Sequence, residues 1–226
     1  MRMSRFLGVV AVLLLLAGLV AGLGLAPRDA VQGNVQRIMY VHVPAILTAY
    51  TAIGAVLVAS IAYLWRGRAA WDRVAAATAE LGVCFIALTL VTGSIWGKPT
   101  WGTWWTWDAR LTSTALLFVI YLGYLLLRSV VEDRERAATY AAVLGILGAL
   151  DVPIIHFSVQ WWRTLHQPAT VLRPQAPAMD GTMLAALAVN VVAFLCTFAY
   201  LAIRRYRLLT LEAEAASRAW RVPVAR

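Results

Sequence analysis

The sequence predicts an all-α integral membrane protein with about six transmembrane helices. Of its 226 residues, 62% are hydrophobic and 14% are charged, which is far too apolar for a water-soluble domain. Six apolar stretches each come close to the ~20 residues that a helix needs to cross a bilayer. Each stretch should be helical, because the hydrocarbon offers no hydrogen-bond partner for an open backbone. We therefore expect a single polytopic membrane domain over residues 1–226.

The expected spans follow one another with short connections and leave a tail at the C-terminus. They cover roughly residues 6–26, 43–65, 74–96, 111–128, 137–157 and 182–203, and the tail is 204–226. The first span starts like a signal peptide, with Arg2 and Arg5 ahead of an apolar run. Because this run is about 20 residues long, and ordinary signal sequences have 7–15 apolar residues, we expect a retained anchor.

The basic residues predict which side of the membrane each connection faces. Fourteen of the 20 lie before the first span, between spans two and three, between spans four and five, or in the tail. Cytoplasmic loops carry the excess of Lys and Arg, so both termini are expected in the cytoplasm. Loops 27–42, 97–110 and 158–181 then face outward. The net charge of +9 reflects this asymmetry and does not indicate a nucleic-acid partner.

The outer loop between the third and fourth spans is the most unusual segment. From Trp96 to Ser113 it reads WGKPTWGTWWTWDARLTS, and five of the ten tryptophans lie between Trp96 and Trp107. An aromatic belt would scatter tryptophans over many helix ends. Here Gly and Pro residues interrupt one short segment and allow it to fold into a shaped surface. The cluster indicates a flat aromatic platform for a large, flat, apolar ligand.

All three histidines fall on the expected outer side. His42 ends the first outer loop, His166 lies in the third, and His156 is near the outer end of the fifth span. A single histidine at a membrane interface is ordinarily a hydrogen-bonded structural residue. Two histidines flanking a tryptophan platform suit axial ligation of haem iron. His156, close to Pro153, is expected to be structural, with a third transient ligand as the alternative.

Local patterns predict the conformation around the two flanking histidines. Loop 27–42 has apolar residues on one helical face, which His42 continues, so we expect a short amphipathic segment on the membrane. Pro44 should help to set the start of the second span. Trp162 and His166 are four residues apart and would share a face if their segment were helical.

Charged residues on the outer side are candidates for contacts with the haem propionates, which favour cationic neighbours. The candidates, each of which could equally be an ordinary headgroup contact, are Lys98, Arg110, Arg163 and Arg173. Asp108 precedes the fourth span and should cap that helix, and it could also pair with Arg110. Asp151 lies inside the fifth span, where an acid needs a partner or a polar cavity.

The string WGKPTWGTWWTWD resembles the tryptophan-rich signature of the haem-handling membrane proteins of cytochrome c maturation, and within them the CcmC family, heme exporter protein C. The segments IMYVHVPAI and HFSVQWWRTLHQP resemble that family's two histidine segments. The resemblance covers nearly the whole chain. It implies that His42 and His166 are the axial ligands of a transiently bound b-type haem. It also implies a haem platform and chaperone docking surface made of Trp96, Trp101, Gly102, Trp104, Trp105, Trp107 and Asp108.

The same resemblance implies partners and a location. Haem would pass to a chaperone of the heme exporter protein E family, which binds it covalently through its own histidine. A small single-span heme exporter protein D and the ABC transporter proteins A and B would belong to the same system. The expected location is the bacterial inner membrane, with the haem site facing the periplasm. We expect haem delivery and not enzymatic turnover, because no nucleophile or acid–base constellation is evident.

Three other functions remain open on the sequence alone. A haem lyase acting directly on apocytochrome c would share the tryptophan loop, but such proteins are usually larger, with extra histidines inside the membrane. A haem-translocating permease subunit of an ABC exporter should also hold haem at the cytoplasmic side, where no histidine is expected. A scaffold anchored by its tryptophans would carry no haem.

Overall fold

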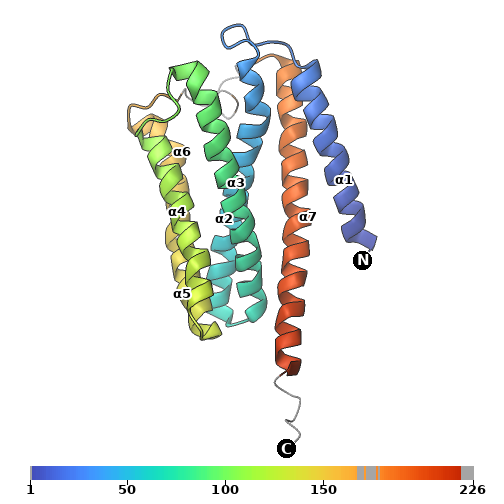
Figure 1. The fold of residues 1–226 in the computed structure, drawn as a ribbon, viewed down its shortest axis with the longest axis vertical. Coiled ribbons are helices and arrows are strands. Elements are labelled where there is room, and N and C mark those ends of the chain that lie inside the picture. The colour runs from blue at the N-terminus through green and yellow to red at the C-terminus, as the bar shows by residue number, and fades with distance from the viewer. Residues whose placement is uncertain (1, 167–170, 172–176, 178, 220–226) are drawn as a thin grey trace, which may run out of the picture.

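The computed structural model of the chain is a bundle of long helices (Figure 1). It describes residues 2–166, 171, 177 and 179–219. Within this part of the chain, six helical segments are long and apolar enough to cross a membrane. They are Arg5–Leu25, Val35–Arg66, Ala69–Trp101, Ala109–Val130, Arg134–Trp161 and Gly181–Arg218. The predicted class, an all-α protein with six membrane-spanning helices, is confirmed.

The helical elements follow the chain with few long connections. They are α1 (Arg2–Leu19), the π-helix η1 (Val20–Leu25), the 3-10 helix η2 (Val35–Ile38), α2 (Met39–Arg66), α3 (Ala69–Trp101), α4 (Ala109–Val130), α5 (Arg134–Ala149), α6 (Asp151–Trp161) and α7 (Gly181–Ala219). Segments α5 and α6 are separated only at Leu150 and together make one membrane-length unit.

The helices alternate in direction, so connections fall at two ends of the bundle. Figure 1 shows the start of α1 and the end of α7 pointing toward one end. The connections from α1 to α2 and from α3 to α4, together with the end of α6, lie at the opposite end. Helix α2 packs against α3, α5 and α7, whereas α1 stands at the edge against α7. The tryptophan segment is therefore at the end of the bundle away from the chain termini.

Small side chains form much of the core between the helices. Ala49, Ala79 and Ala141 are fully buried, and a Cβ on Gly145 would lie 3.0 Å from Val56 Cγ1. Tyr121 adds a hydrogen bond by donating to the Gly145 carbonyl at 2.9 Å. In lipid, helices associate through close packing and interhelical hydrogen bonds, so small residues at these contacts hold the bundle together.

Two ion pairs link helices at the end of the bundle opposite the tryptophans. Arg128 of α4 donates to Asp72 of α3 at 2.9 Å. Arg205 of α7 forms two hydrogen bonds with Glu80 of α3, at 2.6 and 2.9 Å. Paired guanidinium and carboxylate groups of this kind are strong, charge-assisted contacts. These ion pairs fix α4 and α7 to the N-terminal half of α3.

Helical structure begins earlier and ends later than the predicted span boundaries around the histidines. Pro44 was predicted to set the start of the second span, but α2 begins at Met39 and Pro44 lies inside it. Proline is tolerated within transmembrane helices when neighbouring groups satisfy the freed backbone. His42 is therefore a helix residue in the first turn of α2. Likewise α3 continues to Trp101, which places Trp96 and Trp101 on a helix.

The segment before His166 is not helical. Helix α6 ends at Trp161, and Trp162 is extended, with φ −129° and ψ 158°. In a helix, the spacing of four residues would place Trp162 and His166 on one face. Because this segment is not helical, they do not share a face. The chain after Trp162 instead returns to the end of α3, where His166 contacts Trp101.

Candidate functional site

Two histidines that are far apart in the sequence pack against the end of α3. The ring of His42, from α2, meets Trp96 edge-on with centroids 5.6 Å apart. The ring of His166, from the segment after α6, meets Trp101 with centroids 4.7 Å apart. Trp96 and Trp101 are five residues apart on α3, so both rings lie at the same end of that helix. The end of α3 thus brings both flanking histidines and two of the predicted tryptophans into one site.

The position of His42 depends on three residues of α3 and its surroundings. Its Nδ1 atom lies 3.1 Å from Thr92 Oγ1, one helical turn before Trp96. Gly93 leaves room for the ring, because a Cβ there would lie 3.0 Å from His42 Cε1. Trp96 is itself fixed by a 2.8 Å hydrogen bond from its Nε1 to Gln32 Oε1. His42 is therefore held between a hydroxyl and an indole edge.

The position of His166 depends on Asp108. One carboxylate oxygen of Asp108 accepts a 2.8 Å hydrogen bond from the Leu111 amide and caps α4, as the sequence predicted. The other oxygen accepts from the Leu165 amide at 3.2 Å and lies 3.6 Å from His166 Nδ1. Asp108 therefore joins the start of α4 to the segment that carries His166. The pairing with Arg110 that the sequence suggested is replaced by these contacts.

Burial sets the protonation state of His166. Desolvation lowers the pKa of this imidazole to about 4, and the positive charge of Arg110 acts in the same direction. The nearby carboxylate of Asp108 opposes both effects. The ring is therefore neutral at physiological pH, and the neutral imidazole is the form that binds a metal.

A tight cap connects α3 to the tryptophan segment. Gly102 has a φ of 81°, and its amide donates to the Lys98 carbonyl at 3.0 Å. Glycine suits this left-handed position at the end of a helix. The chain then folds back over Gly97, where a Cβ would lie 3.3 Å from the Thr103 carbonyl oxygen. This return keeps the next tryptophans beside the end of α3.

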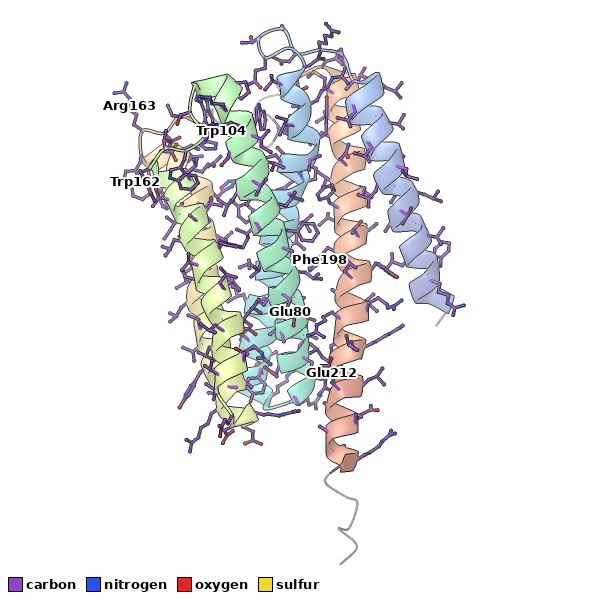
Figure 2. The ribbon with its side chains drawn as sticks, in the orientation of Figure 1. Glu80, Trp104, Trp162, Arg163, Phe198 and Glu212 are labelled. Atoms are coloured by element: carbon purple, nitrogen blue, oxygen red, sulfur yellow. The ribbon has the colours of Figure 1, made fainter. Side chains whose placement is uncertain are left out.

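The five tryptophans divide into two groups. Trp96, Trp101 and Trp105 are partly buried, whereas Trp104 and Trp107 are 57% and 80% exposed. Trp105 and Trp107 meet edge-on at 5.5 Å, so the two groups are continuous. Figure 2 shows Trp104 at the same end of the bundle as Trp162. The platform has one side against the histidines and another side open to a ligand or partner.

Several polar atoms of the site are buried without a hydrogen-bond partner among the described residues. They are Trp105 Nε1, Thr106 Oγ1, Arg110 Nε and His166 Nδ1. Buried polar groups are normally paired, so the unpaired donors Trp105 Nε1 and Arg110 Nε indicate room for acceptors from a ligand. Two imidazoles, an aromatic platform and unpaired donors are the groups that would contact iron, porphyrin and propionates. The residues present therefore fit haem.

Other residues proposed from the sequence lie farther from this centre or serve other contacts. Lys98 donates from Nζ to the Gly102 carbonyl at 3.0 Å and so helps to close α3. Arg163 is exposed, and Figure 2 shows it pointing away from the helices. His156 is exposed, with its ring against Phe157 and its carbonyl accepting from Arg110 at 3.1 Å. Arg173 lies outside the described residues.

The sequence reasoning did not identify every residue that shapes the site. Thr92 and Gly93 were missed, although Thr92 lies four residues before Trp96 and so shares its helical face. Gln32 was also missed, because its contact with Trp96 crosses 64 positions of sequence. Spacing on one helix could have suggested Thr92, but no local signal connects Gln32 to the site.

Comparison with known proteins finds relatives over almost the full length. Residues 1–221 match the model of the family described as heme exporter protein C. The chain is 42% identical to heme exporter protein C of Haemophilus influenzae over 220 residues, 97% of this chain and 89% of that protein. For heme exporter protein C of Bradyrhizobium diazoefficiens the identity is 44% over 225 residues, 96% and 85% of the two chains. For that of Escherichia coli K12 it is 40% over 210 residues, 92% and 84%.

Proposed function

The chain belongs to the heme exporter protein C family, part of the cytochrome c maturation system, and on this premise we propose how it handles haem. His42 and His166 bind haem iron at the outer face of the bacterial inner membrane. The tryptophan segment supports the porphyrin. The protein then delivers the haem to a chaperone of the heme exporter protein E family. This role is delivery and not catalysis.

One observation carries the proposal: two histidines from distant segments pack at the same end of α3, His42 against Trp96 and His166 against Trp101. Imidazole is a common axial ligand of haem iron, and two of them leave no open position for oxygen chemistry. Arg110 and Trp105 support the same assignment, because each has a buried donor nitrogen available to a propionate.

The exposed side of the platform supports delivery. Trp104 and Trp107 remain largely accessible, so a ligand held there keeps one edge open to a partner. Aromatic residues are enriched where protein partners bind. We place the docking surface for the haem chaperone on these two tryptophans. The small single-span heme exporter protein D and the ABC transporter proteins A and B act in the same system.

The membrane orientation in this proposal follows from charge. Most basic residues lie toward the termini and on the two connections at the same end of the bundle. Because cytoplasmic segments carry this excess, the termini face the cytoplasm. The histidine site, at the opposite end, faces the periplasm. Haem bound there is available to a periplasmic chaperone.

The test is an absorption spectrum of purified protein, with and without the chaperone, after addition of haem. Wild-type protein should show a low-spin, six-coordinate spectrum, and His42→Ala and His166→Ala should each lose it. His156→Ala is the matched control and should keep the spectrum, since this ring is exposed and packs on Phe157. Unchanged spectra in both site variants would remove the ligand assignment. A haem-free wild-type protein in both preparations would favour a scaffold that contacts only its partners.

A further inference from the structure

We propose that the two haem-binding histidines are unequal ligands. His166 binds the iron more strongly, and His42 is the ligand that leaves first when haem is passed on. The difference arises from the group beside each Nδ1 atom, which is a carboxylate for His166 and a hydroxyl for His42. This inference rests on the proposed function, because it assigns an order to the same two ligands.

The partner of His42 is a neutral acceptor. The hydroxyl of Thr92 has one proton, which it donates to the Leu88 carbonyl at 2.7 Å. At 3.1 Å from His42 Nδ1, the Thr92 oxygen must therefore accept a hydrogen bond. The proton of the neutral ring is thus on Nδ1, and Nε2 is free to bind a metal. A hydroxyl acceptor fixes this tautomer but adds no negative charge to the ring.

The partner of His166 is a buried carboxylate. The Asp108 side chain is only 9% exposed, and its two oxygens are fixed by the amides of Leu111 and Leu165. The oxygen that accepts from Leu165 lies 3.6 Å from His166 Nδ1, which has no hydrogen-bond partner among the described residues. An approach of about 0.5 Å would make this contact a hydrogen bond. Such a bond also leaves Nε2 of His166 free for iron.

The chemistry of the two partners gives the order of ligand strength. A carboxylate that accepts from a metal-bound histidine raises the basicity of that ligand. Hydrogen bonds to an ionised group are about twice as strong as neutral ones. Asp108 also holds the backbone next to His166 through the Leu165 amide, which keeps the carboxylate beside the ring. An incoming nitrogen ligand, such as an imidazole of a partner protein, therefore replaces His42 and leaves His166 bound.

The inference can be tested with ferric haem added to the purified full-length protein. Asp108→Asn should keep the cap of α4 through its one carbonyl oxygen, because Asn and Asp are equally good at this position, while it removes the charge and the acceptor for the Leu165 amide. It should weaken haem binding by about 10–100-fold, the usual effect of losing such a partner. The haem reduction potential should rise, by about 59 mV for each tenfold loss of preference for ferric iron. Thr92→Val removes the neutral partner of His42 and is the comparison; it should weaken binding and shift the potential less than Asp108→Asn does.

A second comparison leaves Asp108 in place. His166→Ala should lose about tenfold more haem affinity than His42→Ala, in line with the effect of an outer partner on a metal ligand. The inference is overturned, with the proposed function intact, if wild-type protein binds haem and Asp108→Asn alters neither affinity nor potential. It is also overturned if His42→Ala is the more damaging change. A wild-type protein that binds no haem overturns both the inference and the proposed function.

Discussion

Substitution of Gly93 by alanine separates the stability of α3 from its role in the site. A Cβ at this position would lie 3.0 Å from His42 Cε1, and ordinary contacts begin at 3.4 Å. The imidazole must therefore move by about 0.4 Å. Binding groups need to be held within about 0.5 Å of their working geometry, so this displacement uses most of the tolerance. We expect haem affinity to fall about 3–10-fold, or roughly 0.7–1.4 kcal/mol.

The same substitution should not weaken the helix. Glycine inside a helix is less favourable than alanine by about 0.5–1 kcal/mol, chiefly through chain entropy. The Gly93→Ala protein should therefore melt at the same temperature as wild type or higher, while it binds haem less well. Haem titration followed by absorbance measures the affinity, and thermal unfolding of the haem-free protein in detergent measures the stability. Opposite changes in these two quantities are the expected signature.

Gly54→Ala is the matched control for this prediction. Gly54 lies on α2, the helix that carries His42, and a Cβ there would meet nothing within 4 Å. This variant should gain helix stability and keep its haem affinity. If Gly93→Ala and Gly54→Ala bind haem equally well, the ring of His42 is not confined by α3, and the geometric reasoning for that ligand fails.

Three further predictions test the platform, the bundle and the orientation. Trp101→Leu removes an aromatic contact with a site histidine and should reduce haem affinity about 2–10-fold, whereas Trp107→Leu, at an 80% exposed position, should mainly reduce capture of the chaperone. Arg128→Met leaves the carboxylate of Asp72, whose side chain is only 18% exposed, without its partner, so the free energy of unfolding should fall by up to about 3 kcal/mol. The added substitution Asp72→Leu should recover most of that loss in thermal unfolding. Alkaline phosphatase fused within loop 102–108 should be active and fused to the C-terminus inactive; the reverse pattern would contradict the proposed orientation.

The membrane-spanning helices could be predicted because one physical requirement dominates them. A segment that crosses hydrocarbon must be apolar over ~20 residues, and this is visible in any single stretch of sequence. The residues at which the helices end could not be predicted from hydrophobicity. Backbone hydrogen bonds continue beyond the hydrocarbon wherever packing allows, so α3 continues through Gly97 and Pro99 to Trp101. Glycine and proline there indicated a loop, but the left-handed cap comes only at Gly102.

The candidate site was predictable in its residue types and not in its contacts. A dense cluster of tryptophans flanked by two histidines indicated a haem-binding surface, and Asp108 has the position of a helix cap in the sequence. Its second contact, with the Leu165 amide and the His166 ring, joins residues 57 and 58 positions apart. Such a contact depends on where the chain leaves α6. The end of that helix at Trp161 and the extended Trp162 have no clear sequence signal.

Under the proposed function, these long-range contacts allow haem to be captured and released at one site. If the two axial ligands were equally strong, an incoming donor would have no preferred bond to replace, and haem would be held equally by both histidines. With a carboxylate beside His166 and a hydroxyl beside His42, one bond can keep the haem in place while the other is exchanged. The exchangeable ligand also lies on α2, within the bundle, whereas the stronger one lies on the segment after α6. On this reasoning, substitutions at Asp108 should alter how long haem stays bound, and substitutions at Gly93 should alter how readily the second ligand is replaced.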